Sequence, residues 1–320
     1  MKRILLSALL VFGLFAPAQA QDYPQRVIKM IVPASAGGQT DVLAHMLAEK
    51  LKTSLGQSVI IENRVGAGGA IGARAAAAAE PDGYTIFFGN TSTLAVIPAV
   101  AKNAGYDPAK NFAPIASLSE SYMILCVHPS FPAKTLQEFL AYAKANPGKL
   151  NFGNAGAGNV THLTGEMFRS AAGVDFVNIP YPGGAESVTG LLGQQVHFLF
   201  ESPVVLLPLI ADGRLRALGV TSAARKPEAK DIPTLAEAGV PGFEATLLTG
   251  VVAPAGTPAP VVAKLNAAIN DGLKSGDIQS MLAKFGSSPR VDTPQAFTAF
   301  IAGEKQKWSE VAKKAGVSLD

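Results

Sequence analysis

Residues 27–56 have the sequence VIKMIVPASAGGQTDVLAHMLAEKLKTSLG, which predicts a strand, a glycine loop and a helix in succession. The apolar run at 27–32 predicts a strand that Pro33 ends. Apolar residues then recur at helical spacing, so we expect a helix from Thr40 to Leu55, with Gly56 as its C-terminal stop. A strand followed by a helix is the unit from which parallel α/β sheets are built.

The same strand–helix unit recurs along the chain. Further strands are predicted at 59–61, 84–88, 122–127, 150–152, 174–177, 196–200 and 216–220. Helices are predicted at 135–145, 160–171, 258–273, 278–285 and 294–315. This alternation predicts an α/β protein, and no low-complexity linker separates two independent modules. We therefore expect two domains joined by more than one chain crossing, with a hinge and a cleft between them.

The N-terminus has the pattern of a cleaved signal peptide. Lys2 and Arg3 precede an apolar run at 4–16, and small residues follow at Ala18 and Ala20. The run is shorter than the roughly 20 residues that span a bilayer, although an uncleaved N-terminal anchor is the alternative. We predict cleavage after Ala20 and export to the periplasm. Residues 21–320 then remain, a length that favours two domains over one.

Composition and motifs exclude several classes of function. The formal charge of +3 falls to +1 without Lys2 and Arg3, and basic residues form no cluster, so nucleic acid is not an expected partner. The single cysteine, Cys126, lies in an apolar run typical of a buried core residue. Zinc motifs, phosphate loops and serine-hydrolase motifs are all absent from the sequence. We expect no metal, no cofactor and no enzymatic activity.

Three groups of loop residues follow predicted strands and could contact a ligand. In the first loop, 33–41, glycines let the backbone approach a ligand and the helix start offers N–H groups to an anion. Thr40 and Asp41 could instead cap that helix. The second loop, 153–158, repeats this arrangement, and His162 beside it has a structural hydrogen bond as its alternative role. The third group is 181–184 with 200–202. Two facing helix N-termini, one per domain, would clamp a dicarboxylate.

At these loops the sequence resembles the Bug-type solute receptors of tripartite tricarboxylate transporters, over essentially the whole mature chain. The matching blocks occur in order along the chain: Ile31-Val-Pro33, Ala36-Gly-Gly38 with Asp41, Ile61-Glu-Asn-Arg64, Pro81-Asp-Gly-Tyr84, Ala145-Asn-Pro-Gly-Lys-Leu150, His162-Leu163 with Gly165-Glu166, Pro180-Tyr181 and Ala253-Pro-Ala-Gly-Thr-Pro258. Each block alone is weak, but so many in one order make the match specific.

The resemblance implies a periplasmic-binding-protein (Venus flytrap, type II) fold with an interdomain ligand cleft. Domain 1 would comprise residues 21–122 and 243–320, and domain 2 residues 123–242. The implied partners are a small carboxylate and the integral-membrane permease subunits, with the receptor itself a monomer. The expected ligand-binding residues are Ala36, Gly37, Gly38, Thr40, Asp41, Asn90, Thr91, Ser92, Asn154, Ala155, Gly156, Thr161, His162, Tyr181, Gly183 and Glu201.

Two other functions remain open on the sequence alone. A receptor of this fold could present its ligand to a sensor-kinase ectodomain instead of a permease. An exported enzyme of the same architecture is a third interpretation, because a fold does not determine a function.

Overall fold

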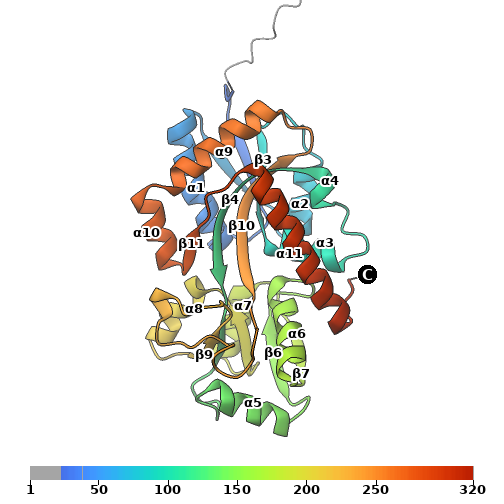
Figure 1. The fold of residues 1–320 in the computed structure, drawn as a ribbon, viewed down its shortest axis with the longest axis vertical. Helices are drawn as coiled ribbons and strands as arrows, with labels where there is room; N and C mark the ends of the chain where they lie inside the picture. The colour runs from blue at the N-terminus through green and yellow to red at the C-terminus, as the bar shows by residue number, and fades with distance from the viewer. Residues whose placement is uncertain (1–22, 38, 320) are drawn as a thin grey trace, which may run out of the picture.

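The computed structural model describes residues 23–37 and 39–319, and its strands form two sheets in the upper and lower halves of Figure 1. The predicted signal peptide, residues 1–20, lies outside these ranges. The first sheet has the order β11-β4-β10-β3-β1-β2 and the second β7-β6-β8-β5-β9. The strands are β1 (Ile28–Val32), β2 (Val59–Asn63), β3 (Thr85–Asn90), β4 (Phe112–Tyr122), β5 (Ile124–Val127), β6 (Leu150–Asn154), β7 (Phe176–Pro180), β8 (Phe198–Glu201), β9 (Arg216–Val220), β10 (Thr246–Pro254) and β11 (Ser287–Pro289).

Helices connect these strands and confirm the predicted α/β class. They are α1 (Gln39–Leu55), α2 (Ala70–Ala77), α3 (Ile97–Val100), α4 (Pro108–Asn111), α5 (Leu136–Ala145), α6 (Val160–Ala172), α7 (Gly184–Leu192), α8 (Pro203–Ala211), α9 (Ala259–Leu273), α10 (Gly276–Lys284) and α11 (Pro294–Ala315). Short 3₁₀ turns occur at η1 (Ala67–Gly69) and η3 (Pro227–Ala229), and η2 (Ser92–Val96) is π-helical.

The two sheets repeat one topology. In the first sheet, β1 pairs in parallel with β2 and β3, and an antiparallel strand, β10, separates β3 from β4. In the second, β6 pairs in parallel with β7 and β8, and the antiparallel β5 separates β8 from β9. In each case the antiparallel strand arrives from the other sheet, so the two halves exchange one strand.

Helices cover both faces of the first sheet. One hydrophobic core packs α1, α9 and α10 on the sheet and includes Met30, Leu43 and Leu265. The opposite core packs α2, α3 and α11 on the other face and includes Ile31 and Phe297. Met30 and Ile31 are neighbours on β1 yet enter different cores, because successive strand side chains point to opposite faces.

The second sheet is covered in the same way. Helices α5 and α6 pack on one face, where Phe139 and Phe168 surround Phe198. Helices α7 and α8 pack on the other face through Leu191 and Leu206. Both sheets are therefore buried on both sides, as expected of doubly wound α/β sheets.

Helix α11 belongs to both halves. Its first turns contribute Phe297 and Ile301 to the core of the first sheet. Its later turns place Trp308 and Ala312 in the core of the second sheet, where α11 packs on α6. Trp308 is fully buried, and its Nε1 donates to Glu304 Oε2 at 3.0 Å. Figure 1 shows this helix running from the upper half of the molecule down to α6 at the top of the lower half.

The crossing between the sheets brings the carboxyl ends of the parallel strands together. The chain leaves the first sheet at Tyr122 and enters the second at Ile124. Glu201, the last residue of β8, pairs with Ile124. The first residue of β10 pairs with Tyr122, and its fourth pairs with Asn90 at the end of β3. The carboxyl ends of β1 and β3 therefore face those of β6 and β8 across the crossing.

The strand prediction differs from the structure at this crossing. The single strand expected at 122–127 is the end of β4 and the whole of β5, which belong to different sheets. Strand β10 and most of β4 were not predicted. Their sequences, TLLTGVVAP and FAPIASLSESY, carry small and polar residues without clear alternation. Both strands lie mid-sheet with both faces covered, and such strands lack the alternating pattern by which half-exposed strands are recognised.

Candidate functional site

Each sheet has one position where the connections leave in opposite directions. After β1 the chain enters α1 on one face, whereas after β3 it enters η2 and α3 on the other. After β6 it enters α6 on one face, whereas after β8 it enters α8 on the other. Ligands of open α/β sheets bind at such switch points, outside the carboxyl ends of the strands. The first loop and residues 90–92 lie at one of these points, and the second loop and Glu201 at the other.

In the first loop, Asp41 supports the backbone. The residue is 5% exposed, and its Oδ2 accepts the N–H of Gly37 at 2.9 Å. Its Oδ1 accepts from Asn63 Nδ2 at 2.7 Å, and the same Nδ2 donates to Ala34 O at 2.9 Å. The carboxylate therefore joins the loop and β2 to the first turn of α1, and the two hydrogen bonds that it accepts come from outside this helix.

The loop backbone itself is open to solvent. Ala36 and Gly37 are exposed, and Thr40 is half-buried. Gly37 has φ of 82°, which favours glycine, and a side chain added there would meet no atom within 4 Å. Gly38 lies outside the described residues. Asn63 was missed as a support for this loop, since its position at the end of a neighbouring strand was the only signal in the sequence.

At the end of β3, three consecutive side chains each accept a backbone N–H: those of Asn90, Thr91 and Ser92. Asn90 Oδ1 accepts the N–H of Thr93, and Thr91 Oγ1 accepts the N–H of Leu248. Ser92 Oγ accepts the N–H of the first α6 residue, Val160, at 3.2 Å. This last bond links the two switch points directly. The π-helical turn that begins at Ser92 is a rare conformation that is frequent at functional sites.

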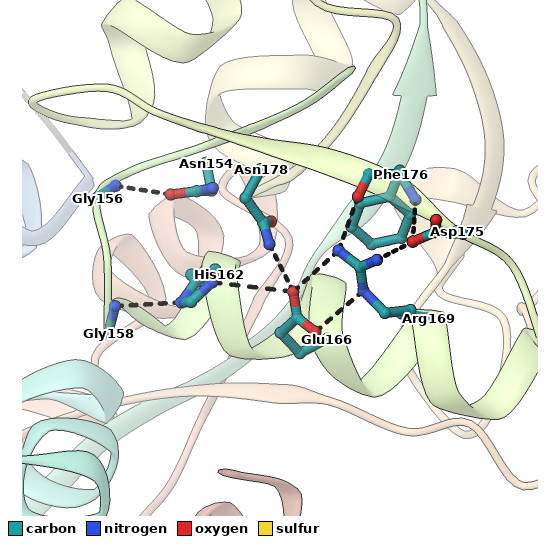
Figure 2. A network of polar contacts seen from close by, with 9 residues as sticks. All are labelled: Asn154, Gly156, Gly158, His162, Glu166, Arg169, Asp175, Phe176 and Asn178. Atoms are coloured by element: carbon teal, nitrogen blue, oxygen red, sulfur yellow. Dashed lines mark hydrogen bonds and ion pairs between the residues drawn. The ribbon is translucent and has the colours of Figure 1, made fainter. Parts of the chain in front are cut away.

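Three backbone N–H groups of the second loop are bound by side chains of Asn154 and of α6, and Figure 2 shows two of these bonds. Ala155 N–H donates to Thr161 Oγ1 at 2.9 Å, and Gly156 N–H donates to Asn154 Oδ1 at 3.1 Å. Gly158 N–H donates to His162 Nδ1 at 3.2 Å. A ligand carboxylate that used these three amides would replace side-chain acceptors with its own oxygens.

His162 is held in one tautomer by this arrangement. Because Nδ1 accepts a hydrogen bond from Gly158, the neutral ring carries its own proton on Nε2, which lies 3.9 Å from Glu166 Oε1. Burial lowers the pKa of His162. The nearby negative charge of Glu166 raises this pKa, and the positive charge of Arg169 lowers it further. The imidazole is therefore a neutral acceptor for the loop, which is the structural role considered from the sequence.

Glu166 is the centre of the polar network in Figure 2. It is 6% exposed, and its Oε1 accepts from Asn178 Nδ2 at 2.6 Å. Arg169 Nε donates to Glu166 Oε2 at 3.1 Å, and Arg169 Nη2 donates to Phe176 O at 2.8 Å. The network thus ties α6 to β7 behind the second loop. The only sequence signal for it was the spacing of four residues between His162 and Glu166, which places both on one helix face.

Tyr181 and Gly183 follow the outer strand β7 and lie one strand away from the switch point. Tyr181 OH donates to Gln195 Oε1 at 3.3 Å, and its ring lies against Gly190 of α7. Gly183 is the N-cap of α7 in an extended conformation. Glu201, by contrast, lies at the switch point itself, where its Oε1 accepts the N–H of Ser202 at 2.7 Å. Burial raises the pKa of Glu201, and the Ser202 bond opposes this in part.

The single cysteine, Cys126, is fully buried, as expected, and burial raises the pKa of its thiol. Within residues 23–37 and 39–319, His, Cys, Asp and Glu form no group of three that could hold a metal. None of the helices described is both long and apolar enough to cross a membrane. A surface cavity of about 610 Å³ lies between α6 and α11, on the outer side of Glu166 and away from the ligand loops.

Comparison with known proteins matches residues 43–317 to the family described as the tripartite tricarboxylate transporter family receptor. Protein BugT of Bordetella pertussis is 37% identical over 308 residues, which are 96% of this chain and 94% of that protein. The solved structure of R. palustris Rpa4515 with adipate has a TM-score of 0.89 at 35% identity, and the match covers 93% of this chain and 99% of that one. MatC (Rpa3494) from Rhodopseudomonas palustris with bound malate has a TM-score of 0.84 at 33% identity, over 90% and 99% of the two chains.

These similarities agree with the fold. The structural neighbours are periplasmic binding proteins, and the repeated strand order with facing carboxyl edges confirms the predicted flytrap architecture. The family and its neighbours are binding receptors. The family match covers both sheets, from α1 to the end of α11. This chain therefore belongs to the family of tripartite tricarboxylate transporter receptors.

Proposed function

We propose that this chain is a periplasmic receptor that captures a small carboxylate between its two lobes and delivers it to an integral-membrane permease. The observation that carries the proposal is the meeting of two switch points across the crossing, each with a glycine loop leading into a helix N-terminus. The similarity to proteins solved with adipate and with malate supports a carboxylate as the ligand class.

The finer assignments belong to the same proposal. Residues 21–122 with 243–320 form domain 1 and residues 123–242 form domain 2, and a signal peptide is removed after Ala20. The receptor acts as a monomer and catalyses no reaction, which its membership of a family of binding receptors supports. The residues predicted above to bind the ligand contact it directly or, like Asp41 and His162, hold the loops that do.

A thermal-shift screen of the mature protein against aliphatic mono-, di- and tricarboxylates tests the proposal. A true ligand raises the melting temperature by mass action, and closure of two lobes around it lowers the radius of gyration in X-ray scattering. No shift with any carboxylate, or binding without a change in scattering, would contradict it.

A pair of glycine variants tests the location of the site. Gly37 and Gly213 both have positive φ, and a side-chain carbon added at either would meet no atom within 4 Å, so alanine strains each backbone similarly. Gly213 lies between α8 and β9, remote from the ligand loops. We expect Gly37→Ala to weaken carboxylate binding and Gly213→Ala to leave it unchanged. Equal affinities for the two variants would remove the first loop from the site.

A further inference from the structure

Glu201 occupies a position at the second switch point that would otherwise suit an anion. It ends β8, whose neighbour β6 ends in the second ligand loop, and it pairs with Ile124 at the chain crossing. On β8 its side chain follows Leu199 onto the face covered by α7 and α8. The carboxylate therefore lies where the proposed ligand space meets the starts of these two helices.

Both helix starts contact this carboxylate. Oε1 accepts the N–H of Ser202, the residue that precedes α8, at 2.7 Å. Oε2 lies close against Gly184, the first residue of α7: a side-chain carbon added there would stand 2.1 Å from it. Helix N-termini favour negative charge, so the protein's own carboxylate fills the anion position that α7 and α8 create.

Among residues 23–37 and 39–319, no charged side chain lies close enough to influence this carboxylate. The influences on its pKa are burial and the Ser202 hydrogen bonds, with no charged side chain among them, and no ion pair of the described residues involves it. Glu201 is a half-buried residue, and the N–H of Ser202 binds its Oε1 and not its Oε2. A second carboxylate placed beside it would be disfavoured by like-charge repulsion, whereas a hydrogen-bond donor would be favoured.

We propose that Glu201 determines ligand specificity by accepting a hydrogen bond from a hydroxyl or ammonium group that the ligand carries next to a carboxylate. This inference rests on the proposed receptor function and narrows its ligand class to hydroxy- and amino-carboxylates. The ligand's carboxylates are bound on the side of the α1 and α6 N-termini, and its donor points to the start of α7 and α8. A plain aliphatic carboxylate of the same length leaves Glu201 without that bond.

The test uses matched ligands that differ only in the donor. Calorimetric titrations of mature protein compare propionate with lactate, succinate with malate and aspartate, glutarate with glutamate, and adipate with 2-aminoadipate. At the chain length that binds most tightly, we expect the donor-bearing ligand to bind at least about tenfold more tightly, the factor that corresponds to one net charge-assisted hydrogen bond.

Variants separate the role of the charge from that of the fold. Glu201→Gln retains an oxygen for the Ser202 N–H, so we expect this variant to fold. Its preference for the donor-bearing ligand over the matched ligand without a donor should be reduced about fivefold or more. Glu310→Gln, on the exposed outer surface of α11, serves as the matched control and should keep the wild-type preference. A melting curve for each variant reports folding.

The possible outcomes distinguish this inference from the proposed function. Equal binding of plain and donor-bearing ligands by wild type would overturn the inference alone, and so would a preference that survives Glu201→Gln. If none of these carboxylates binds at all, the receptor function proposed above fails and the inference fails with it.

Discussion

Replacing Glu166 with alanine should destabilise the second lobe more than any surface ion pair could. The substitution removes the acceptor of the 2.6 Å bond from Asn178 Nδ2 and one partner of Arg169. A hydrogen bond to a charged group contributes about 1.5–3 kcal/mol. The Arg169 side chain is 28% exposed and still contacts Asp175 and Phe176 O in the variant. Loss of the Glu166–Arg169 ion pair therefore adds about 1 kcal/mol or less. We expect the free energy of unfolding to fall by about 2–4 kcal/mol.

The loss is larger than that of an exposed ion pair because Glu166 is only 6% exposed, although it borders the surface cavity between α6 and α11. Asn178 Oδ1 already has no partner among the described residues, nor does the neighbouring Asn154 Nδ2. Without Glu166, both ends of the half-buried Asn178 amide would be unpaired, and an unsatisfied buried group costs about 1–3 kcal/mol. Urea titration followed by circular dichroism gives the free energy, and thermal melts at the same pH should show a drop of roughly 4–12 °C.

Two further variants make the reasoning refutable. Glu166→Gln keeps an acceptor for Asn178 without the charge, so its stability should lie between wild type and Glu166→Ala. Asp271→Ala removes a solvent-exposed pair with Lys274, which is worth about 0.5 kcal/mol or less. If Glu166→Ala loses no more stability than Asp271→Ala, the network in Figure 2 does not hold α6 to β7.

Three other substitutions test the remaining supports of the site. Asn63→Ala removes a charge-assisted hydrogen bond of about 1.5 kcal/mol beneath the first loop. Calorimetry should therefore show roughly tenfold weaker carboxylate binding. The control Asn146→Ala, at the end of α5, should leave carboxylate affinity unchanged. Gly165→Ala places a carbon 2.1 Å from the Phe152 ring, and such overpacking costs about 1–3 kcal/mol. The higher helix propensity of alanine contributes at most about 1 kcal/mol of stability. Urea titration should therefore show a net decrease in the free energy of unfolding. Burial raises the pKa of Glu201, which makes its ionised form unfavourable in the folded state. Glu201→Gln should therefore melt above wild type at neutral pH, with a difference that shrinks as pH falls toward the usual glutamate pKa; a constant difference would contradict this sign.

Local periodicity was enough to predict the strand–loop–helix units. Helix α11 begins at Pro294, with Thr293 as its N-cap, as the sequence indicated, and α1 starts within one residue of its predicted position. Gly56 ends α1 with φ of 70°, the left-handed conformation expected of a stop glycine. These features depend on residues within one or two turns of each other, so the sequence alone contains their cause.

The candidate loops were also found from the sequence, because a strand, a glycine loop and a helix start are consecutive in the chain. The acceptors of the loop amides were not found. Gly37 donates to Asp41, Gly156 to Asn154 and Gly158 to His162, and each choice depends on side-chain directions set by packing.

Only the tertiary structure determined which strands share a sheet and which side chains meet behind the loops. Strand β10 pairs with β3 and β4 across more than a hundred residues of intervening chain, and Asn63 reaches Asp41 from a neighbouring strand. Such contacts have no periodic signature, since they arise from the burial of both sheet faces and not from neighbours in sequence. The sequence by itself therefore determined the elements and the loops, while the strand exchange, the Glu166 network and the placing of Glu201 between two helix starts follow from how those elements pack.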